Sequence, residues 1–119
     1  MIDYQRELNE EQLEVVWHGY GPCLVLAGAG SGKTRVITYR VAYLLEKGID
    51  PQNILLVTFT NKAADEMIRR VQQLIESQDR LSWAGTFHHI AYKILRQYAP
   101  VLGYKNNFSV LDSDDSETL

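Results

Sequence analysis

The chain has 119 residues, 45% of them hydrophobic and 23% charged, which is the composition of one soluble globular domain. No stretch reaches the roughly 18 apolar residues that a membrane helix needs, and the N-terminus is too acidic for a secretory signal. The net charge of −3 combines acidic ends with a body, residues 15–111, where eleven basic residues outnumber six acidic ones, a balance compatible with a polyanionic partner.

The first predicted helix begins after Asn9. Asn9 is a favourable N-cap, and Gln12 stands three residues later, where a capping box requires an amide or a carboxylate. Leu8 and Leu13 have the spacing of a hydrophobic staple across this helix start. These signals agree on one helix boundary.

The apolar run 23–27 predicts a strand that is buried on both faces, and a helix follows it. One face of that helix carries Ile37, Val41, Leu44 and Leu45. Gly48 is expected just beyond its last turn, and Pro51 ends it. The strand also holds Cys23, the single cysteine, which cannot form an internal disulfide and favours a reducing compartment such as the cytoplasm.

The alternation of strand and helix then repeats. Strands are predicted over 53–59, 81–87 and 107–112, and helices follow the first two. The apolar stripes of these helices are Ala64, Met67, Ile68, Val71, Leu74 and Ile75, and then Ala91, Ile94, Leu95 and Tyr98, before Pro100. Three strand–helix units in succession predict an α/β fold with a parallel sheet.

The stretch "AGAGSGKT", residues 27–34, has the spacing of a Walker A phosphate-binding loop, or P-loop, between a predicted strand and a helix. Small residues let main-chain amides reach phosphate oxygens, and the helix amino end adds positive potential. Lys33 would contact the terminal phosphates, and the Thr34 hydroxyl would bind Mg²⁺. A glycine-rich turn without a ligand is the alternative. The expected nucleotide-binding residues are Ala27, Gly28, Ala29, Gly30, Ser31, Gly32, Lys33 and Thr34.

Four segments, in order, resemble motifs of superfamily 1 DNA helicases of the UvrD/Rep/PcrA type. "LNEEQLEVV" is similar to their Q motif and "AGAGSGKTRV" to motif I. "VTFTNKAADEM" resembles motif Ia, "GTFHHIAYKILR" motif Ib, and "FSVLDSDD" the segment after it. The resemblance covers essentially the whole chain. It implies the first RecA-like P-loop NTPase domain of an ATP-dependent helicase that moves 3′ to 5′ along single-stranded DNA and unwinds duplex at a junction, for example in DNA repair.

The resemblance also implies roles for single residues. Gln12 would read the adenine edge, unless it serves only the capping box, and Arg35 would lie near the base and sugar, unless it is simply solvated. Phe59 would stack on a DNA base, with a core position as the alternative, and Asn61 is either a DNA contact or an N-cap. The remaining residues expected to contact DNA are Thr60, Lys62, Thr86, Phe87 and His88.

The acids that bind Mg²⁺ and position the attacking water in ATP hydrolysis are not identifiable here, and the family places their motif beyond Leu119. Asp114 and Asp115 precede a predicted helix and do not end a buried strand, so they are not substitutes. We therefore expect residues 1–119 to be the incomplete first part of the domain, inactive alone and prone to self-association through an uncovered sheet edge. The alternatives are another P-loop NTPase, or a truncated ATP- and DNA-binding module without catalysis.

Overall fold

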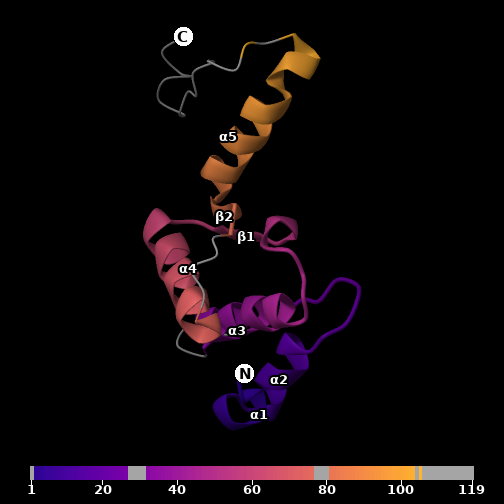
Figure 1. Ribbon diagram of the computed structural model, residues 1–119, viewed down its shortest axis with the longest axis vertical. Coiled ribbons are helices and arrows are strands. Elements are labelled where there is room, and N and C mark those ends of the chain that lie inside the picture. The colour runs from indigo at the N-terminus through magenta and orange to yellow at the C-terminus, as the bar shows by residue number, and fades with distance from the viewer. Residues whose placement is uncertain (1, 27–31, 77–80, 104, 106–119) are drawn as a thin grey trace.

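The computed structural model describes residues 2–26, 32–76, 81–103 and 105 (Figure 1). Its helices are α1 (Tyr4–Glu7), α2 (Glu10–Val16), α3 (Lys33–Glu46), α4 (Asn61–Ile75) and α5 (Phe87–Tyr98). Its strands are β1 (Leu55–Thr58) and β2 (Trp83–Thr86), and its 3₁₀ turns are Pro51–Asn53 and Ala99–Leu102. The strand predicted over 107–112 and the acidic helix start after it lie outside the described residues.

The two strands pair in parallel, in register from Leu55 opposite Trp83 to Thr58 opposite Thr86. The chain leaves β1, runs through α4 and returns as β2, which is a strand–helix–strand crossover. The predicted α/β class with parallel strands is therefore confirmed. Over the described residues, however, the sheet has two strands, whereas the sequence predicts three strand–helix units in succession.

The strand predicted over 23–27 is wrong for its described part, because residues 23–26 form no strand. Leu24 and Leu26 are 87% and 89% exposed. A continuous apolar run becomes a buried strand only when other strands pair with its main chain and helices cover both faces. Here β1 and β2 pair with each other, and α3 is consequently not tied to the sheet by a strand of its own.

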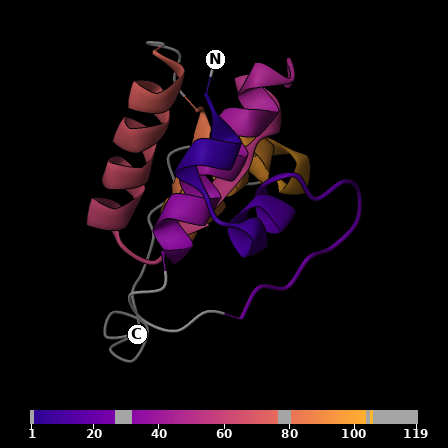
Figure 2. The ribbon, with the colours of Figure 1, turned by 90° about the horizontal axis from the view of Figure 1, so that it is seen from below.

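The main core lies between α3, α4 and the sheet (Figure 2). The stripe predicted for α4 is confirmed, since Ala64, Met67 and Val71 are buried in it. On α3, Val41 is buried, and Leu44 and Leu45 pack against the same cluster. Ile37 departs from the predicted face and is 41% exposed, while the neighbouring Thr38 is buried and donates its hydroxyl to the Thr34 carbonyl at 2.6 Å.

The apolar stripe predicted for α5 is not covered. Ile94, Leu95 and Tyr98 are about half exposed, and Ile90 is the buried residue of the helix. The reason is visible in Figure 1, where α5 rises from β2 and extends away from the other described helices. Helical periodicity predicts which side chains share a face, but a face is buried only where another element packs on it.

The N-terminal helices α1 and α2 pack together with α3, and the predicted start of α2 is confirmed. The capping box is complete, because Asn9 Oδ1 accepts from the Gln12 amide at 2.8 Å and Gln12 Oε1 accepts from the Asn9 amide at 3.0 Å. Leu8 is buried, and Leu13 packs in the same cluster, as a hydrophobic staple requires. At the other end of α2, Arg40 Nη1 donates to the carbonyl oxygens of Val15, Val16 and His18 at 2.9–3.1 Å.

The end of α3 follows the predicted pattern around Gly48. Gly48 has φ +91°, its amide donates to the Leu45 carbonyl, and the Ile49 amide donates to the Leu44 carbonyl. This is the Schellman arrangement, in which a left-handed residue lets two amides satisfy the last carbonyls of a helix. Glu46, the last helical residue, accepts hydrogen bonds from the Ile2 amide at 3.2 Å and the Tyr4 hydroxyl at 2.7 Å.

The buried Tyr4 phenol gives folding a dependence on alkaline pH. Burial raises the pKa of Tyr4 above its ordinary value of 10.0, and the hydrogen bond to Glu46 raises it further. The folded chain thus holds this proton to higher pH than the unfolded chain does. The stabilisation is complete below about pH 10 and is lost as the pH rises above it, at up to about 1.4 kcal/mol per pH unit.

We expect the free energy of unfolding of Tyr4→Phe to fall less steeply above pH 10 than that of the wild-type chain. Denaturant unfolding followed by circular dichroism between pH 8 and pH 11.5 measures the difference. Tyr20→Phe is the matched control, because Tyr20 is fully exposed, and it should keep the wild-type slope. Identical slopes for all three chains would show that Tyr4 does not hold its proton more tightly when folded.

Candidate functional site

The amino end of α3 is built to leave main-chain amides available to an acceptor. Its N-cap is Gly32, at φ +82°, and no side chain caps it. The other described α-helices are capped by Asp3, Asn9, Thr60 and Thr86. The first amides of a helix have no partner within it, and in α3 these include the amides of Lys33 and Thr34. Residues 27–31 of the predicted loop lie outside the described residues.

Gln12 lies against this helix end. A Cβ added to Gly32 would be 3.2 Å from Gln12 Nε2, so position 32 needs glycine both for its positive φ and for this close approach. The Gln12 oxygen is held by the capping box of α2, which aims the amide nitrogen toward the amino end of α3. The capping box is thus confirmed, and since capping does not exclude a second role, it also fixes the Gln12 side chain beside the predicted phosphate loop.

Arg35 connects α3 to α1. Its Nη2 donates to the Glu7 carbonyl oxygen at 2.8 Å and lies 3.3 Å from Glu7 Oε2, and its guanidinium carbon is 4.9 Å from the centre of the Tyr39 ring. Both charged side chains are more than 40% exposed, so the ion pair contributes little to stability. Arg35 also lines a cleft of about 370 Å³, together with Thr38, Tyr39, Arg70, Gln73 and Leu74.

Two phenylalanines meet where the paired strands end. Phe59 follows β1 and Phe87 follows β2, and their ring centres are 5.1 Å apart. Phe59 is 89% exposed and Phe87 is 53% exposed, which excludes the core position that the sequence left open for Phe59. An exposed aromatic pair at the carboxyl edge of a parallel sheet lies where ligands of such sheets bind, and it offers ring faces on which a base can stack.

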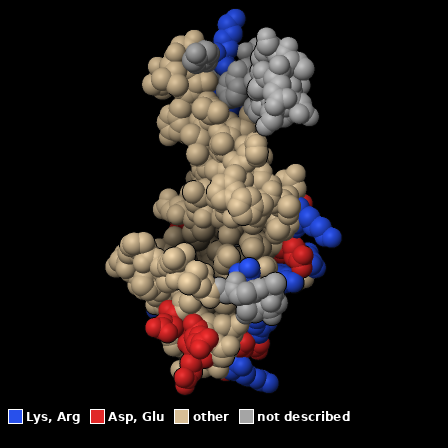
Figure 3. Space-filling model, turned by 180° about the vertical axis from the view of Figure 1, so that it is seen from behind, with Lys and Arg blue, Asp and Glu red and all other residues tan. Residues whose placement is uncertain are grey.

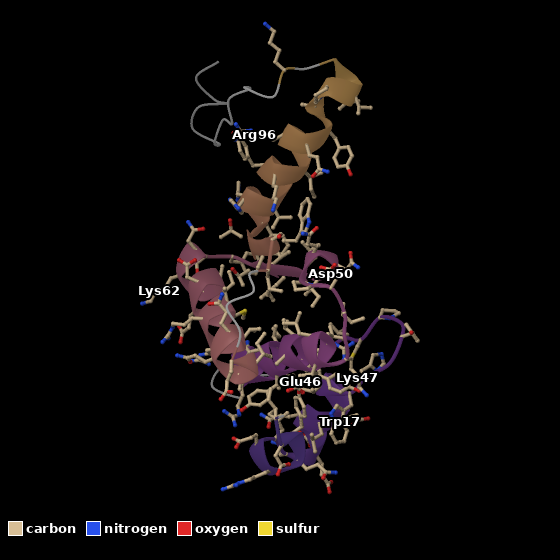
Figure 4. The ribbon with its side chains drawn as sticks, viewed as in Figure 1. Trp17, Glu46, Lys47, Asp50, Lys62 and Arg96 are labelled. Atoms are coloured by element: carbon tan, nitrogen blue, oxygen red, sulfur yellow. The ribbon has the colours of Figure 1, made fainter. Side chains whose placement is uncertain are left out.

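The amino ends of α4 and α5 flank this pair. Thr60 Oγ1 accepts from the Ala63 amide at 3.2 Å, and Thr86 Oγ1 accepts from the His89 amide at 3.1 Å. Thr60, and not Asn61, is therefore the N-cap of α4. Asn61, Lys62 and His88 are among the exposed residues around the two ends, and Figure 4 shows Lys62 on the outer side of α4. Two helix amino ends give this edge a positive potential.

Among the described residues, the structure does not bring the predicted nucleotide residues at the start of α3 together with the predicted DNA residues. The cleft beside Arg35 places the amino half of α3 against Arg70, Gln73 and Leu74, in the carboxyl half of α4. The aromatic pair lies at the opposite, amino end of α4, and a helix of 15 residues is about 22 Å long. The direction of α3 is set by packing on α4, because the run 23–26 joins no sheet.

Gly85 is a site residue that sequence reasoning missed. It is buried in β2, and a Cβ there would be 2.9 Å from His89 Cδ2. A larger residue at this position would therefore force the His89 side chain, in the first turn of α5, to move. Gly85 falls in a predicted strand and in the segment that resembles motif Ib, where it has no predicted role of its own; a glycine three residues before the predicted helix was the available signal.

The described residues contain no helix long and apolar enough to cross a membrane. They also contain no group of three or more His, Cys, Asp or Glu side chains placed to hold a metal ion. For Mg²⁺, the residue proposed from the sequence is Thr34, which is half-buried in the first turn of α3. A single protein hydroxyl suits Mg²⁺ only where phosphate and water supply the other ligands.

Comparison with known proteins gives one family. Residues 8–119 match the model of the UvrD/REP helicase N-terminal domain. The chain is 50% identical over 113 residues, 94% of its length, to a protein of Staphylococcus aureus named ATP-dependent DNA helicase PcrA. It is 48% identical over 115 residues, 96% of its length, to the protein of the same name from Staphylococcus epidermidis. The match spans 16% of the length of each relative.

Proposed function

Because this chain belongs to the UvrD/REP helicase N-terminal domain family, we propose that it is the ATP-binding and single-stranded-DNA-contacting part of an ATP-dependent 3′-to-5′ DNA helicase. Its relatives carry the name ATP-dependent DNA helicase. The full-length protein would couple ATP hydrolysis to movement along one strand and to unwinding at a duplex junction. It would act in the cytoplasm.

The observation that carries this proposal is the position of Gln12 beside the uncapped amino end of α3. Main-chain amides, the helix dipole and the exposed Lys33 ammonium offer positive potential for the phosphates of ATP. The Gln12 amide, which is held by its capping box, would bind the adenine edge. Thr34 would supply a hydroxyl ligand to Mg²⁺, and the loop residues 27–31 would supply further amides.

The DNA contact is proposed for the carboxyl edge of the sheet. Phe59 and Phe87 would stack on bases, because their rings are exposed and adjacent. Thr60, Asn61, Lys62, Thr86 and His88 would contact phosphates around the amino ends of α4 and α5. Asn61, Lys62 and His88 are exposed there. The Thr60 and Thr86 hydroxyls accept hydrogen bonds from the main-chain amides of the helices that they cap, and each hydroxyl can still donate one.

The proposal is tested by the ATP hydrolysis of the full-length protein with and without oligothymidine. We expect single-stranded DNA to stimulate hydrolysis, because the proposed function couples DNA binding to ATP hydrolysis. Blunt duplex of equal nucleotide content is the control and should stimulate less. A rate that does not respond to single-stranded DNA would favour a different P-loop NTPase.

A further inference from the structure

The side of α5 that is turned away from Phe87 forms an open hollow of about 380 Å³. His89, Tyr92, Lys93, Arg96 and Gln97 line it. At 100° per residue, the two cations and His89 lie about 180–240° around the helix axis from Phe87. We call these three residues, His89, Lys93 and Arg96, the α5 basic face. Figure 4 shows Arg96 on the upper half of α5.

Within residues 81–105, the charge around the α5 basic face is of one sign. Residues 81–105 contain Lys93, Arg96 and Lys105 and no Asp or Glu. Figure 3 shows the acidic side chains of the described residues in the lower half of the molecule, alongside Lys and Arg side chains. The described residues of the segment 81–105 therefore present positive charge, which attracts an anion.

Aromatic rings hold both cations without neutralising them. Lys93 Nζ lies 4.6 Å from the centre of the Trp83 ring and donates to the Ser82 carbonyl oxygen. The Arg96 guanidinium carbon lies 5.8 Å from the centre of the Tyr92 ring. The ion pairs between described residues are Arg35 with Glu7 and Arg70 with Glu66, so neither α5 cation has a described carboxylate partner. Among the described residues, the charge of Lys93 and Arg96 is held in place by rings and is not neutralised by a carboxylate.

We propose that the α5 basic face binds the phosphate backbone of the duplex arm at a DNA junction, while Phe59 and Phe87 hold the unpaired strand on the other side of α5. This inference rests on the proposed function. A single strand stacked on Phe87 would have to wrap around the helix, which is about 10 Å across, to reach Lys93 and Arg96. The phosphate backbone of a second DNA segment, the duplex arm, reaches Lys93 and Arg96 directly. The seven-residue rise from His89 to Arg96, about 10 Å, spans roughly three phosphates of one strand.

The experiment measures fluorescence anisotropy of two labelled DNAs with the full-length protein. One is a duplex with a 3′ single-stranded tail, and the other is the tail alone. We expect the double variant Lys93→Gln/Arg96→Gln to bind the tailed duplex about tenfold more weakly at 100 mM salt. The slope of log affinity against log salt should fall by about 0.9 for each lost phosphate contact, roughly 1.8 in all. Affinity for the tail alone should change less than twofold.

Two controls separate charge from folding and position. Lys93→Arg/Arg96→Lys keeps both charges and should bind the tailed duplex as the wild type does. Lys47→Gln removes a cation that also lies over a ring, that of Tyr43, at the distant end of α3, and it should change neither affinity. Unchanged binding of the tailed duplex by the Gln/Gln variant overturns the inference, as does an equal loss on the tail alone.

Phe59→Ala distinguishes this inference from the proposed function. If Phe59→Ala weakens binding of the tail while the Gln/Gln variant has no effect on either DNA, the α5 basic face is wrong and the proposed DNA edge survives. If Phe59→Ala changes neither affinity, or if the wild-type protein binds neither DNA, the proposed DNA edge fails and the inference fails with it.

Discussion

Replacement of Lys33 by alanine is expected to cause a severe loss of Mg²⁺–ATP binding by the full-length protein. Lys33 is the first residue of α3 and is exposed at a helix end without a side-chain cap. Loss of its charge-assisted contact with the phosphates should weaken binding on the order of 100-fold. Because Lys33 is exposed, the fold should be unaffected. Isothermal titration calorimetry with a non-hydrolysable ATP analogue measures the loss.

Lys47→Ala is the matched control for this change. Lys47 caps the carboxyl end of the same helix, and its ammonium lies 5.4 Å from the centre of the Tyr43 ring. The two substitutions remove the same charge from opposite ends of α3, so only the one at the amino end should affect ATP. Wild-type affinity in Lys33→Ala would show that the phosphates do not bind at this helix end.

The second large effect is expected from Phe59→Ala and Phe87→Ala, assayed with oligothymidine. Stacking of a base on an aromatic ring is worth about 1–3 kcal/mol, so each change should weaken binding by about 5- to 150-fold. The salt dependence should stay the same, because no phosphate contact is removed. The two losses should not add, since the rings contact each other at 5.1 Å between centres.

Tyr20→Ala controls for the loss of an exposed aromatic side chain. Tyr20 is fully exposed in the segment after α2 and lies outside the proposed DNA edge, so its removal should leave DNA affinity unchanged. If all three variants lose affinity equally, binding is non-specific. Should Phe59→Ala and Phe87→Ala both bind as tightly as the wild-type protein, the aromatic pair is not a base-stacking surface.

Features that depend on neighbouring residues could be predicted from the sequence. The Asn9–Gln12 capping box, the Gly48 helix end and the buried stripe of α4 all formed as expected. Each rests on spacings of three to eight residues, over which the backbone geometry of a helix fixes which groups meet. The parallel pairing of β1 and β2 also followed, because a crossover helix of this length joins parallel strands.

Features that depend on distant partners could not be predicted. The apolar run 23–26 had the composition of a buried strand but has no strand beside it, and the stripe of α5 has no described helix on it. Arg40 binds carbonyl groups 22 to 25 residues away, for which no local pattern exists. The separation of the amino end of α3 from the Phe59–Phe87 pair follows from the packing of α3 on α4, which depends on contacts between residues far apart in the sequence.

The central claim is that ATP phosphates bind at the amino end of α3 and that Gln12 contacts the adenine base. Proton–nitrogen correlation spectra of the chain, titrated with Mg²⁺ and a non-hydrolysable ATP analogue, test it most directly. We predict that the main-chain amides of Gly32, Lys33 and Thr34 and the side-chain amide of Gln12 shift together with one affinity, and that the amides of Lys47 and Gly48 do not. Shifts that leave these four groups unchanged, or no shifts at millimolar nucleotide, would contradict the claim.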